Sequence, residues 1–413
     1  MKRLLFVDDE RMVLNGLRRA LHDMHQEWEM SFVDSAAAAL QVLDTADHDA
    51  IVTDIRMPIM DGAQLLDRVK EQHPAVMRVV LSGQSSRETV LRSIAPAHQF
   101  LSKPCDPEEL KRRLKQAFAM RDLLCNESVK TLVSRLRSIP SLPALYDELS
   151  AELRAEDVSL ARIASIISRD VGMAAKILQL ANSAFIGVRG QVSNVVQAIS
   201  LIGTETVRTL VLSVHVFSHF DRSSDAAVWL PPLWEHSVAT AALAQRIANC
   251  EKTSKSVAED SFTAGLLHDV GKVVLLAEME PEYRTILDSK EAAPSAVVEM
   301  EKELLGCTHA QVGAYLMSIW GLPAPLVHAV AFHHQPSEAG ETVFSSLTAV
   351  HVADALSCEK EPSLLIHDVE LDWIHLDQAS LRSRVVSWRE LHDGSASTEP
   401  KGENSERENS VRG

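Results

Sequence analysis

The sequence has few cysteines, no long apolar run and too few basic residues to balance its acidic ones. None of its five cysteines forms a Cys-x-x-Cys pair, which argues against a disulfide framework or a thiolate zinc site; they are Cys105, Cys125, Cys250, Cys307 and Cys358. No apolar run approaches the roughly 20 residues that cross a bilayer. The apolar run that precedes Asp8, Leu4–Val7, is only four residues long, which is too short for a signal peptide. We expect a cytoplasmic protein that does not enter the membrane.

The shortage of positive charge is concentrated in the second part of the chain. The formal net charge is −16, from 41 basic and 57 acidic residues. Residues 1–120 hold 16 basic and 18 acidic side chains, so the remainder holds 25 and 39, which gives balances of −2 and −14. A region this acidic has no electrostatic footprint for a phosphate backbone. Direct DNA binding is therefore not expected, whereas protein partners and cationic ligands are compatible with this charge.

Residues 1–120 alternate short apolar runs with amphipathic helical segments, among them 12–24 and 62–72. This pattern predicts an α/β domain with a five-stranded, doubly wound parallel sheet. The expected strands are Leu4–Val7, Ser31–Val33, Ala50–Thr53, Val76–Leu81 and Gln99–Leu101.

Polar residues follow four of these strands, at the edge where such sheets carry their chemistry. They are Asp8 and Asp9, Asp54, Ser82 and Lys103. Three carboxylates in one crevice repel one another unless a hard divalent cation such as Mg²⁺ lies among them. Asp54, the central one, is a candidate nucleophile for an aspartyl phosphate, which an ammonium and a hydroxyl would stabilise. The alternative is that these residues only cap helices and form turns.

This part of the chain resembles the receiver family of response regulators. The motifs that carry the resemblance are Val7-Asp8-Asp9-Glu10, Thr53-Asp54-Ile55-Arg56-Met57-Pro58, Met60-Asp61-Gly62 and Lys103-Pro104. The resemblance implies that Asp54 accepts a phosphoryl group from a sensor histidine kinase, and that Ser82 and Lys103 hold that group. It also implies Mg²⁺ bound by Asp9, Asp54 and the Arg56 carbonyl, with Asp8 in the outer shell. Phe100 is at the family's switch position, although ordinary core packing explains it equally well.

A linking segment is expected at 121–138. Apolar residues keep helical spacing beyond the first domain, from Leu110 to Leu124. We expect a continuous helix that packs on its own sheet, transmits a rearrangement, or pairs with a second copy of the chain in a homodimer. The prolines of Ser138-Ile139-Pro140-Ser141-Leu142-Pro143 then end it.

In the second half of the chain, apolar residues recur with helical spacing. This pattern predicts an all-α domain over 139–340 and a helical extension over 341–393. Its helical repeats include 160–168, 172–181, 195–201, 206–217, 237–248 and 262–267, and, in the extension, 344–356 and 371–391. The tail 394–413 has almost no apolar residues and is expected to be disordered.

Histidine marks a second candidate site, because twelve of the 17 histidines follow residue 200. Adjacent His268 and Asp269 can bind one divalent ion together with His236 and Asp354 from other helices. This mixed nitrogen and oxygen set suits Mn, Fe or Zn. Such an ion can activate water for phosphoester hydrolysis. The alternative is a buried hydrogen-bonded pair without metal.

The motif His268-Asp269-Val270-Gly271-Lys272 is similar to that of the HD superfamily of metal-dependent phosphohydrolases. His309, His333 and His334 fall where its cyclic-dinucleotide-hydrolysing HD-GYP branch has further metal ligands, but the Gly-Tyr-Pro segment is absent. We expect these three to be partly exposed histidines at helix ends, and Lys272 to form an ion pair. His215 and His219 are expected on a solvated helix face.

Longer motifs over roughly 135–335 resemble the HDOD family, whose members are regulatory or scaffolding relatives of the HD hydrolases. They are Ile139-Pro140-Ser141-Leu142-Pro143, Ile167-Ser168-Arg169-Asp170, Leu180-Ala181-Asn182-Ser183-Ala184-Phe185, Gln197-Ala198-Ile199-Ser200-Leu201-Ile202-Gly203, Trp234-Glu235-His236 and Trp320-Gly321-Leu322-Pro323.

Together these patterns predict a response regulator whose HDOD output acts through a protein partner. The competing hypothesis is a receiver-gated, metal-dependent phosphohydrolase, either a cyclic dinucleotide phosphodiesterase or a phosphatase, acting at the HD residues.

Overall fold

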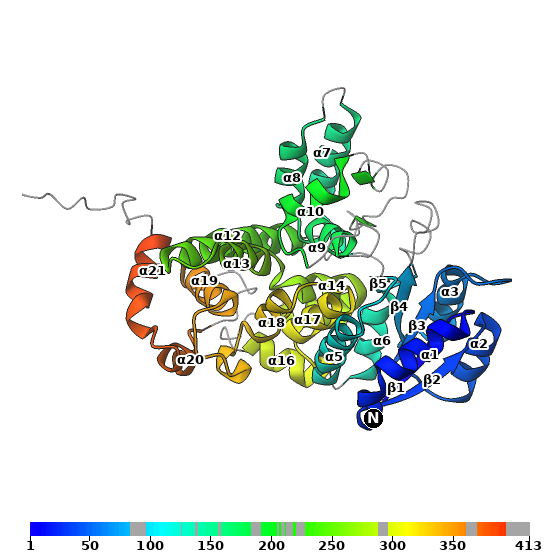
Figure 1. The fold of residues 1–413 in the computed structure, drawn as a ribbon. Coiled ribbons are helices and arrows are strands. Elements are labelled where there is room, and N and C mark those ends of the chain that lie inside the picture. Colours follow the sequence, from blue (N-terminus) through cyan, green and yellow to red (C-terminus); the bar gives the residue numbers. More distant parts are fainter. Residues whose placement is uncertain are drawn as a thin grey trace, which may run out of the picture.

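A computed structural model of the chain shows an α/β unit followed by a larger helical unit (Figure 1). The structure describes residues 1–82, 96–124, 126–136, 139–155, 158–182, 191–204, 206–207, 211, 218–219, 228–287, 296–360 and 370–393. Most of the helix expected at 206–217, the side chains of His215 and His219, and the tail 394–413 lie outside the described residues.

The first unit is a five-stranded parallel sheet of order β2-β1-β3-β4-β5, as the alternation of apolar runs predicted. Its strands are β1 (Lys2–Val7), β2 (Trp28–Val33), β3 (Ala50–Asp54), β4 (Met77–Ser82) and β5 (Gln99–Ser102). The described helices around them are α1 (Arg11–Ala20), η1 (His22–Gln26), α2 (Ala36–Thr45), α3 (Gly62–Gln72) and α5 (Pro107–Leu123).

Helix α3 begins directly beneath the carboxyl end of β3. The Asp61 side chain caps it by accepting a hydrogen bond from the Gln64 amide, and the Gln64 side-chain oxygen accepts one from the Asp61 amide. A Cβ on Gly62 would lie 2.0 Å from the carbonyl oxygen of Asp54. Glycine at this position therefore lets the helix start against the strand end that carries Asp54.

The expected continuous linking helix is wrong, because the chain forms two helices, α5 and α6 (Glu127–Arg135). The Asn126 side chain accepts hydrogen bonds from the amides of Ser128 and Val129 and starts α6 afresh. The break turns the chain between the two units.

The second unit is helical apart from a short parallel pairing of β6 (Pro140–Ser141) with β7 (Ser218–His219). Its helices up to the middle of the unit are α7 (Pro143–Arg154), α8 (Leu160–Ile167), α9 (Val171–Ala181), α10 (Val195–Ile202), α12 (Leu230–Cys250), α13 (Lys255–Leu267) and α14 (Val270–Glu278). Those that follow are α15 (Glu280–Leu287), α16 (Ala296–Leu305), α17 (His309–Ile319), α18 (Ala324–Phe332), η3 (Pro336–Ala339), α19 (Ser346–Lys360), α20 (Trp373–Gln378), η4 (Arg382–Arg384) and α21 (Val385–His392).

Buried Asp170 joins two of the sequence motifs. One carboxylate oxygen accepts from the Leu142 amide at 2.9 Å, and the other caps α9 by accepting from the Met173 amide at 2.8 Å. A Cβ on Gly172 would lie 2.6 Å from the carbonyl oxygen of Ile139. These contacts fix the start of the second unit against α9.

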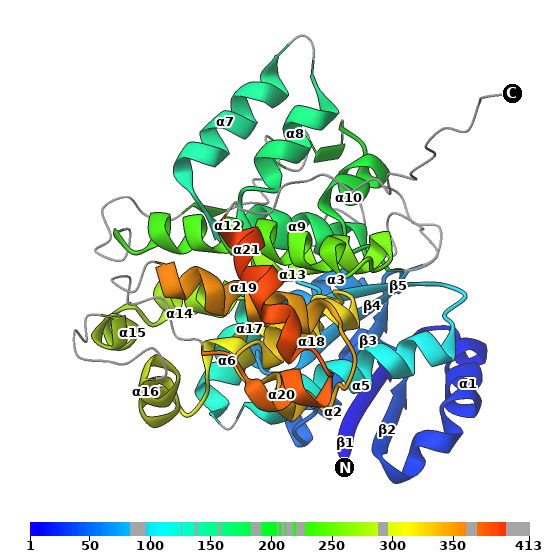
Figure 2. The same ribbon diagram turned by 90° about the vertical axis from the view of Figure 1, so that its left-hand side faces the viewer.

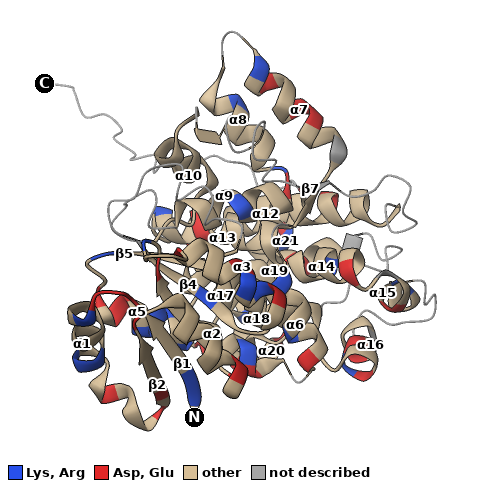
Figure 3. Ribbon diagram, turned by 90° about the vertical axis from the view of Figure 1, so that its right-hand side faces the viewer, with Lys and Arg blue, Asp and Glu red and all other residues tan. Residues whose placement is uncertain are grey.

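Helices α12, α13, α17, α18 and α19 form the centre of the second unit, while α7 and α8 stand away from it (Figure 2). Helix α21 closes one side, where the indole of buried Trp388 donates to Glu251 at 2.9 Å. Acidic residues lie on α7, α15 and α16 (Figure 3). Within the described residues, no helix has both the length and the hydropathy to cross a membrane.

Candidate functional sites

The strand-end residues of the first unit meet around one ammonium group. Lys103 Nζ lies 2.7 Å from Asp54 Oδ1 and 2.6 Å from Asp8 Oδ2, and Asp8 and Asp54 are both buried. Burial alone would lower the pKa of Lys103, but hydrogen bonds and charges from the two carboxylates raise it. The three side chains form a charged crevice at the end of β1, β3 and β5.

The other expected members of this crevice have different surroundings. Asp9 is exposed beside Asp8, and the Arg56 amide donates to Asp54 Oδ2 at 3.1 Å. Ser82 ends β4, but its side chain lies outside the described residues. Phe100 is packed in the core and is 5% exposed.

The charge of the crevice fits a divalent cation. Three carboxylates (Asp8, Asp9 and Asp54) and one ammonium (Lys103) leave a net charge of −2. Carboxylate oxygens are hard ligands of the kind that Mg²⁺ prefers.

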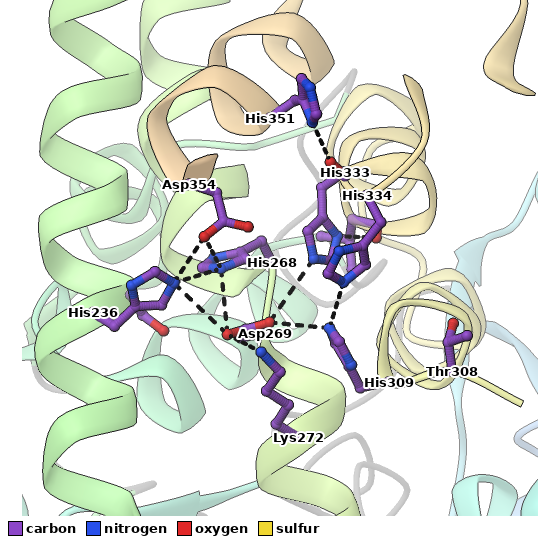
Figure 4. Close-up of polar contacts among 12 residues, drawn as sticks. His236, His268, Asp269, Lys272, Thr308, His309, His333, His334, His351 and Asp354 are labelled. Atoms are coloured by element: carbon purple, nitrogen blue, oxygen red, sulfur yellow. Dashed lines mark hydrogen bonds and ion pairs between the residues drawn. The ribbon is translucent and has the colours of Figure 1, made fainter. Parts of the chain in front are cut away.

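The histidine cluster lies in the second unit, between helices from distant parts of the chain (Figure 4). We use this name for seven residues: His236 of α12, His268 and Asp269 between α13 and α14, His309 of α17, His333 and His334 after α18, and Asp354 of α19. The structure thus brings together the four expected HD residues and the three further histidines that the sequence marked as less favoured metal ligands.

Asp269 lies between two halves of the cluster. The first half is His236, His268 and Asp354, and the second half is His309, His333 and His334. In the first half, His236 Nε2 lies 3.0 Å from Asp354 Oδ1 and 3.2 Å from His268 Nε2. Asp269 Oδ2 is 3.4 Å from His268 Nε2, and its other oxygen, Oδ1, is 3.2 Å from His309 Nε2 in the second half. Two donors bound to one ion at about 2.1 Å lie about 3.0–3.4 Å apart, so these spacings fit metal ligands.

The outward-facing nitrogens fix the direction of three rings. His268 Nδ1 donates to the Gly265 carbonyl at 2.7 Å, and His333 Nδ1 donates to the Val330 carbonyl at 2.8 Å. His309 Nδ1 bonds a carboxylate oxygen of Glu301 at 2.8 Å. An imidazole held in this way presents Nε2 to a metal, and such outer partners are typical of metal-bound histidine.

Among the described residues, the buried atoms of the cluster without a hydrogen-bond partner include His333 Nε2 and Asp354 Oδ2. Burial, first of all, lowers the pKa of His333 to about 3, so this ring is neutral and offers a lone pair. Burial opposes charge on His268 as well, but Asp269 and Asp354 raise its pKa to about 9. The unpartnered lone pairs indicate a place for a cation.

Two glycines explain how these helices approach so closely. A Cβ on Gly271 would lie 1.9 Å from the carbonyl oxygen of His309, and one on Gly265 would lie 2.8 Å from Ala241 Cα. Gly271 therefore lets α14 reach α17, and Gly265 lets α13 reach α12. The glycine of the His268–Lys272 motif thus places Asp269 within contact of His309.

The expectation of partly exposed histidines at helix ends is wrong for His309 and His333, both of which are fully buried. All three, including half-buried His334, point into the cluster, and His334 Nε2 lies 2.9 Å from His309 Nε2. Lys272 forms the expected ion pair, with Nζ 3.0 Å from Asp269 Oδ2.

Glu301 of α16 is a residue that the sequence did not identify. It is fully buried and accepts hydrogen bonds from the Tyr283 hydroxyl at 2.7 Å and the His309 amide at 2.9 Å. Burial would raise its pKa, but the charge of His309 and these bonds lower it. No motif marks it, because it lies eight residues before His309 on another helix.

A cavity of about 110 Å³ opens beside the second half of the cluster. It is lined by His334 and by residues of α16 and α17, including Lys302 and Gln311, and by Leu123 at the end of α5. The cavity therefore lies where the first unit meets the cluster.

Family models match both units. The model of the response regulator receiver domain matches residues 4–115, and the model of the HDOD domain matches residues 139–336.

Among curated proteins, an uncharacterized protein of Treponema pallidum is 25% identical over 282 residues, which cover 68% of this chain and 52% of that protein. The hydrogenase transcriptional regulatory protein HoxA of Bradyrhizobium diazoefficiens is 34% identical over 116 residues, 28% of this chain and 23% of HoxA. The chain thus spans about half the length of the first relative and about a quarter of the second. Among solved structures, the MmoQ response regulator of Methylococcus capsulatus is 23% identical with a TM-score of 0.46, over 61% of this chain and 98% of MmoQ.

Proposed function

The chain joins an N-terminal response regulator receiver domain to a C-terminal HDOD domain, and we propose that it is controlled by phosphorylation of Asp54. The donor is a sensor histidine kinase. The observation that carries the proposal is the placement of Lys103 Nζ between the Asp54 and Asp8 carboxylates. On this proposal, the chain is a response regulator of a two-component system, and the HDOD domain is its output.

In the transfer, an Asp54 oxygen forms a bond to phosphorus as the bond to the kinase histidine breaks. The Lys103 ammonium, already held at 2.7 Å from Asp54, balances the charge of the incoming oxygens, and the Ser82 hydroxyl donates to another. Asp9, Asp54 and the Arg56 carbonyl would hold Mg²⁺, with Asp8 in the outer shell. When bound, Mg²⁺ neutralises charge on the transferred group.

Acetyl phosphate with Mg²⁺ tests this proposal directly. Intact mass spectrometry should find one added phosphoryl group on the wild-type chain and none on Asp54→Asn. Asp61→Asn is the matched control, because that carboxylate only caps α3, and it should be labelled like the wild type. Equal labelling of Asp54→Asn and the wild type would refute the assignment.

The output of the HDOD domain, on this proposal, is contact with a protein partner or with a second copy of the chain. The net charge of −14 over residues 121–413 supports this form of output, because it disfavours binding to a phosphate backbone. Sedimentation of the chain with and without acetyl phosphate tests the self-association branch. A change that Asp54→Asn abolishes would support that branch, and unchanged sedimentation would leave a different protein as the partner.

A second function, metal-dependent phosphoester hydrolysis, is favoured by one specific observation. Seven potential ligands converge, and buried His333 Nε2 and Asp354 Oδ2 have no hydrogen-bond partner among the described residues. His236, His268 and Asp354 would hold one ion, His309, His333 and His334 a second, and Asp269 would contact both. Such ions, of Mn, Fe or Zn, supply a bound water with a lowered pKa.

Metal analysis of the purified full chain tests this second function. Bound Mn, Fe or Zn near stoichiometry, lost in His268→Ala/Asp269→Ala, would support it, as would hydrolysis of cyclic dinucleotides or phosphomonoesters that the double variant lacks. His328→Ala is the control, since this α18 histidine bonds Glu341 away from the cluster. A chain that stays metal-free after incubation with Mn²⁺, Fe²⁺ and Zn²⁺ would rule it out.

A further inference from the structure

Helix α17 contributes to the histidine cluster and also contacts the receiver. Its first residue, His309, is a member of the histidine cluster, and α5 of the receiver packs along the same helix. The described contacts of the receiver and linker are distributed from the amino end to the carboxyl end of α17.

At the carboxyl end of α17, the receiver contacts the turn into α18. The buried Gln99 side chain donates to the Ser318 carbonyl at 2.8 Å, and Gln116 of α5 donates to the Leu322 carbonyl at 3.3 Å. Gly321 has a φ of +73°, and a Cβ there would lie 2.7 Å from Arg113 Nη1 and 3.3 Å from Gln99 Cδ. The Trp320–Pro323 motif is therefore the surface on which the receiver is docked.

In the middle of α17, the linker helix α6 makes a buried contact. Ser134 Oγ lies 3.1 Å from the Tyr315 hydroxyl, and both residues are buried. The Ser134 carbonyl in turn accepts from Arg78 Nη2 at 2.6 Å and from His98 Nε2 at 2.8 Å. Strands β4 and β5 are thus tied to α17 through a single turn of α6.

At the amino end of α17, the linker holds the turn that leads into His309. The Asn126 side chain donates to the Leu305 carbonyl at 2.8 Å. Four residues later, the amide and ring of His309 both bond Glu301 of α16. The Asn126 contact therefore acts on the segment that sets the position of the His309 ring.

The amino-terminal half of α17 packs closely against α14. Gly271 and Gly313 bring α14 and α17 together with no room for a Cβ on Gly271. An eleven-residue helix such as α17 moves as a unit, because its backbone hydrogen bonds are internal. A displacement of α17 at Ser318 would carry His309 with it and change its distance of 3.2 Å from Asp269.

On the receiver side, one segment carries both the phosphorylation chemistry and the contact with α17. Gln99 begins β5, and Lys103, which holds Asp54, directly follows that strand. A phosphoryl group on Asp54 adds negative charge and oxygen acceptors beside Lys103. Lys103 is four residues along the chain from Gln99, so a shift of Lys103 can reach the contact between Gln99 and α17.

We propose that α17 couples phosphorylation of Asp54 to the metal affinity of the histidine cluster, with Gln99 and Asn126 as the receiver and linker contacts. The inference rests on the proposed metal-binding function and names its regulation. Coupling between sites is reciprocal, so metal in the cluster also changes the affinity of the receiver for a phosphoryl analogue. Couplings of this kind usually change affinity by about fivefold or more.

Two measurements on the full chain test the coupling, each with and without beryllium fluoride and Mg²⁺ as an analogue of the phosphoryl group. Hydrogen exchange of peptides covering 308–320 reports on α17 itself, and Mn²⁺ titration reports on the cluster. Exchange in α17 and the Mn²⁺ dissociation constant should both change in the wild type and stay unchanged in Asp54→Asn.

Gln99→Ala should reduce both effects by at least half, because it removes the contact with Ser318. Lys115→Ala is the matched control, since this exposed α5 residue pairs only with Glu27 of the receiver, and it should behave like the wild type. Unchanged exchange in α17, or an unchanged dissociation constant for bound Mn²⁺, would overturn the coupling. If Mn²⁺ binds in neither state, the metal-binding function fails, and the exchange measurement alone decides whether α17 responds to the receiver.

Discussion

Gly271 lies directly against the carbonyl of His309, so close that a methyl group at its α-carbon would fall 1.9 Å from the oxygen. This contact ties the start of α14 to the start of α17. It also sets the separation of the two halves of the histidine cluster, because Asp269 and His309 lie at the starts of those helices.

Gly271→Ala should therefore destabilise the HDOD domain by about 2–3 kcal/mol and weaken metal binding, because one of the two helices must move away. Chemical denaturation with metal titration measures both. Gly16→Ala is the control, since a Cβ there in α1 meets nothing within 4 Å and should stabilise by about 0.5–1 kcal/mol. Equal, small effects from both substitutions would contradict the packing argument.

Glu301→Gln should lower the metal affinity of the cluster by about 10–100-fold, because the amide no longer holds the His309 ring with a charged acceptor. Titration with Mn²⁺ or Zn²⁺ at several pH values measures the change and its dependence on His309 protonation. Glu303→Gln, at an exposed position of the same helix, should match the wild type. A variant that unfolds at lower temperature but binds metal normally would assign Glu301 a purely structural role.

Gly321→Ala should loosen the docking of the receiver on α17. The substitution combines a backbone strain of about 1–3 kcal/mol at positive φ with a clash against Arg113 and Gln99. Gly340→Ala separates the two effects, because Gly340 has a φ of +71° but open space around its Cβ position. Hydrogen exchange in 96–104 should rise in Gly321→Ala only. The same rise in both variants would show that strain alone is responsible.

Asp170 should make the stability of the HDOD domain depend on pH. Burial raises its pKa to about 6, whereas hydrogen bonds from Met173 and Leu142 lower it. Because the folded pKa lies above the unfolded value near 3.8, its stabilising contribution is complete below pH 4 and is lost as the pH rises through 6. The loss amounts to about 3 kcal/mol.

Urea denaturation of the full chain between pH 4 and 7, followed by tryptophan fluorescence, measures this dependence. Asp170→Asn should remove the decline between pH 4 and 6 relative to the wild type. Glu235→Gln, at an exposed position on α12, should leave it in place. Parallel pH curves for Asp170→Asn and the wild type would show that Asp170 ionises normally.

Much of the receiver could be predicted from the sequence, because parallel strands must end at one edge and the residues after them must meet. Of the four HD residues, His268 and Asp269 lie in one motif, whereas His236 and Asp354 were predicted from the order of ligands in the HD superfamily. The burial of His309 and His333 did not, since the helices that cover them come from elsewhere in the chain. The break at Asn126 was not predicted, because apolar residues keep helical spacing up to Leu124. The contacts of Glu301, Gln99 and Gln116 were not predicted either, because single polar residues do not form a periodic pattern.

The contacts of Gln99, Ser134 and Asn126 with the HDOD domain bear on how such chains can be recombined. A foreign receiver grafted at Pro140 would be covalently continuous with the HDOD domain and would still lack all three contacts. A functional chimera would need its exchange boundary drawn through side-chain partners, so that β5, α5 and α6 travel together with the α17–α18 turn that they recognise.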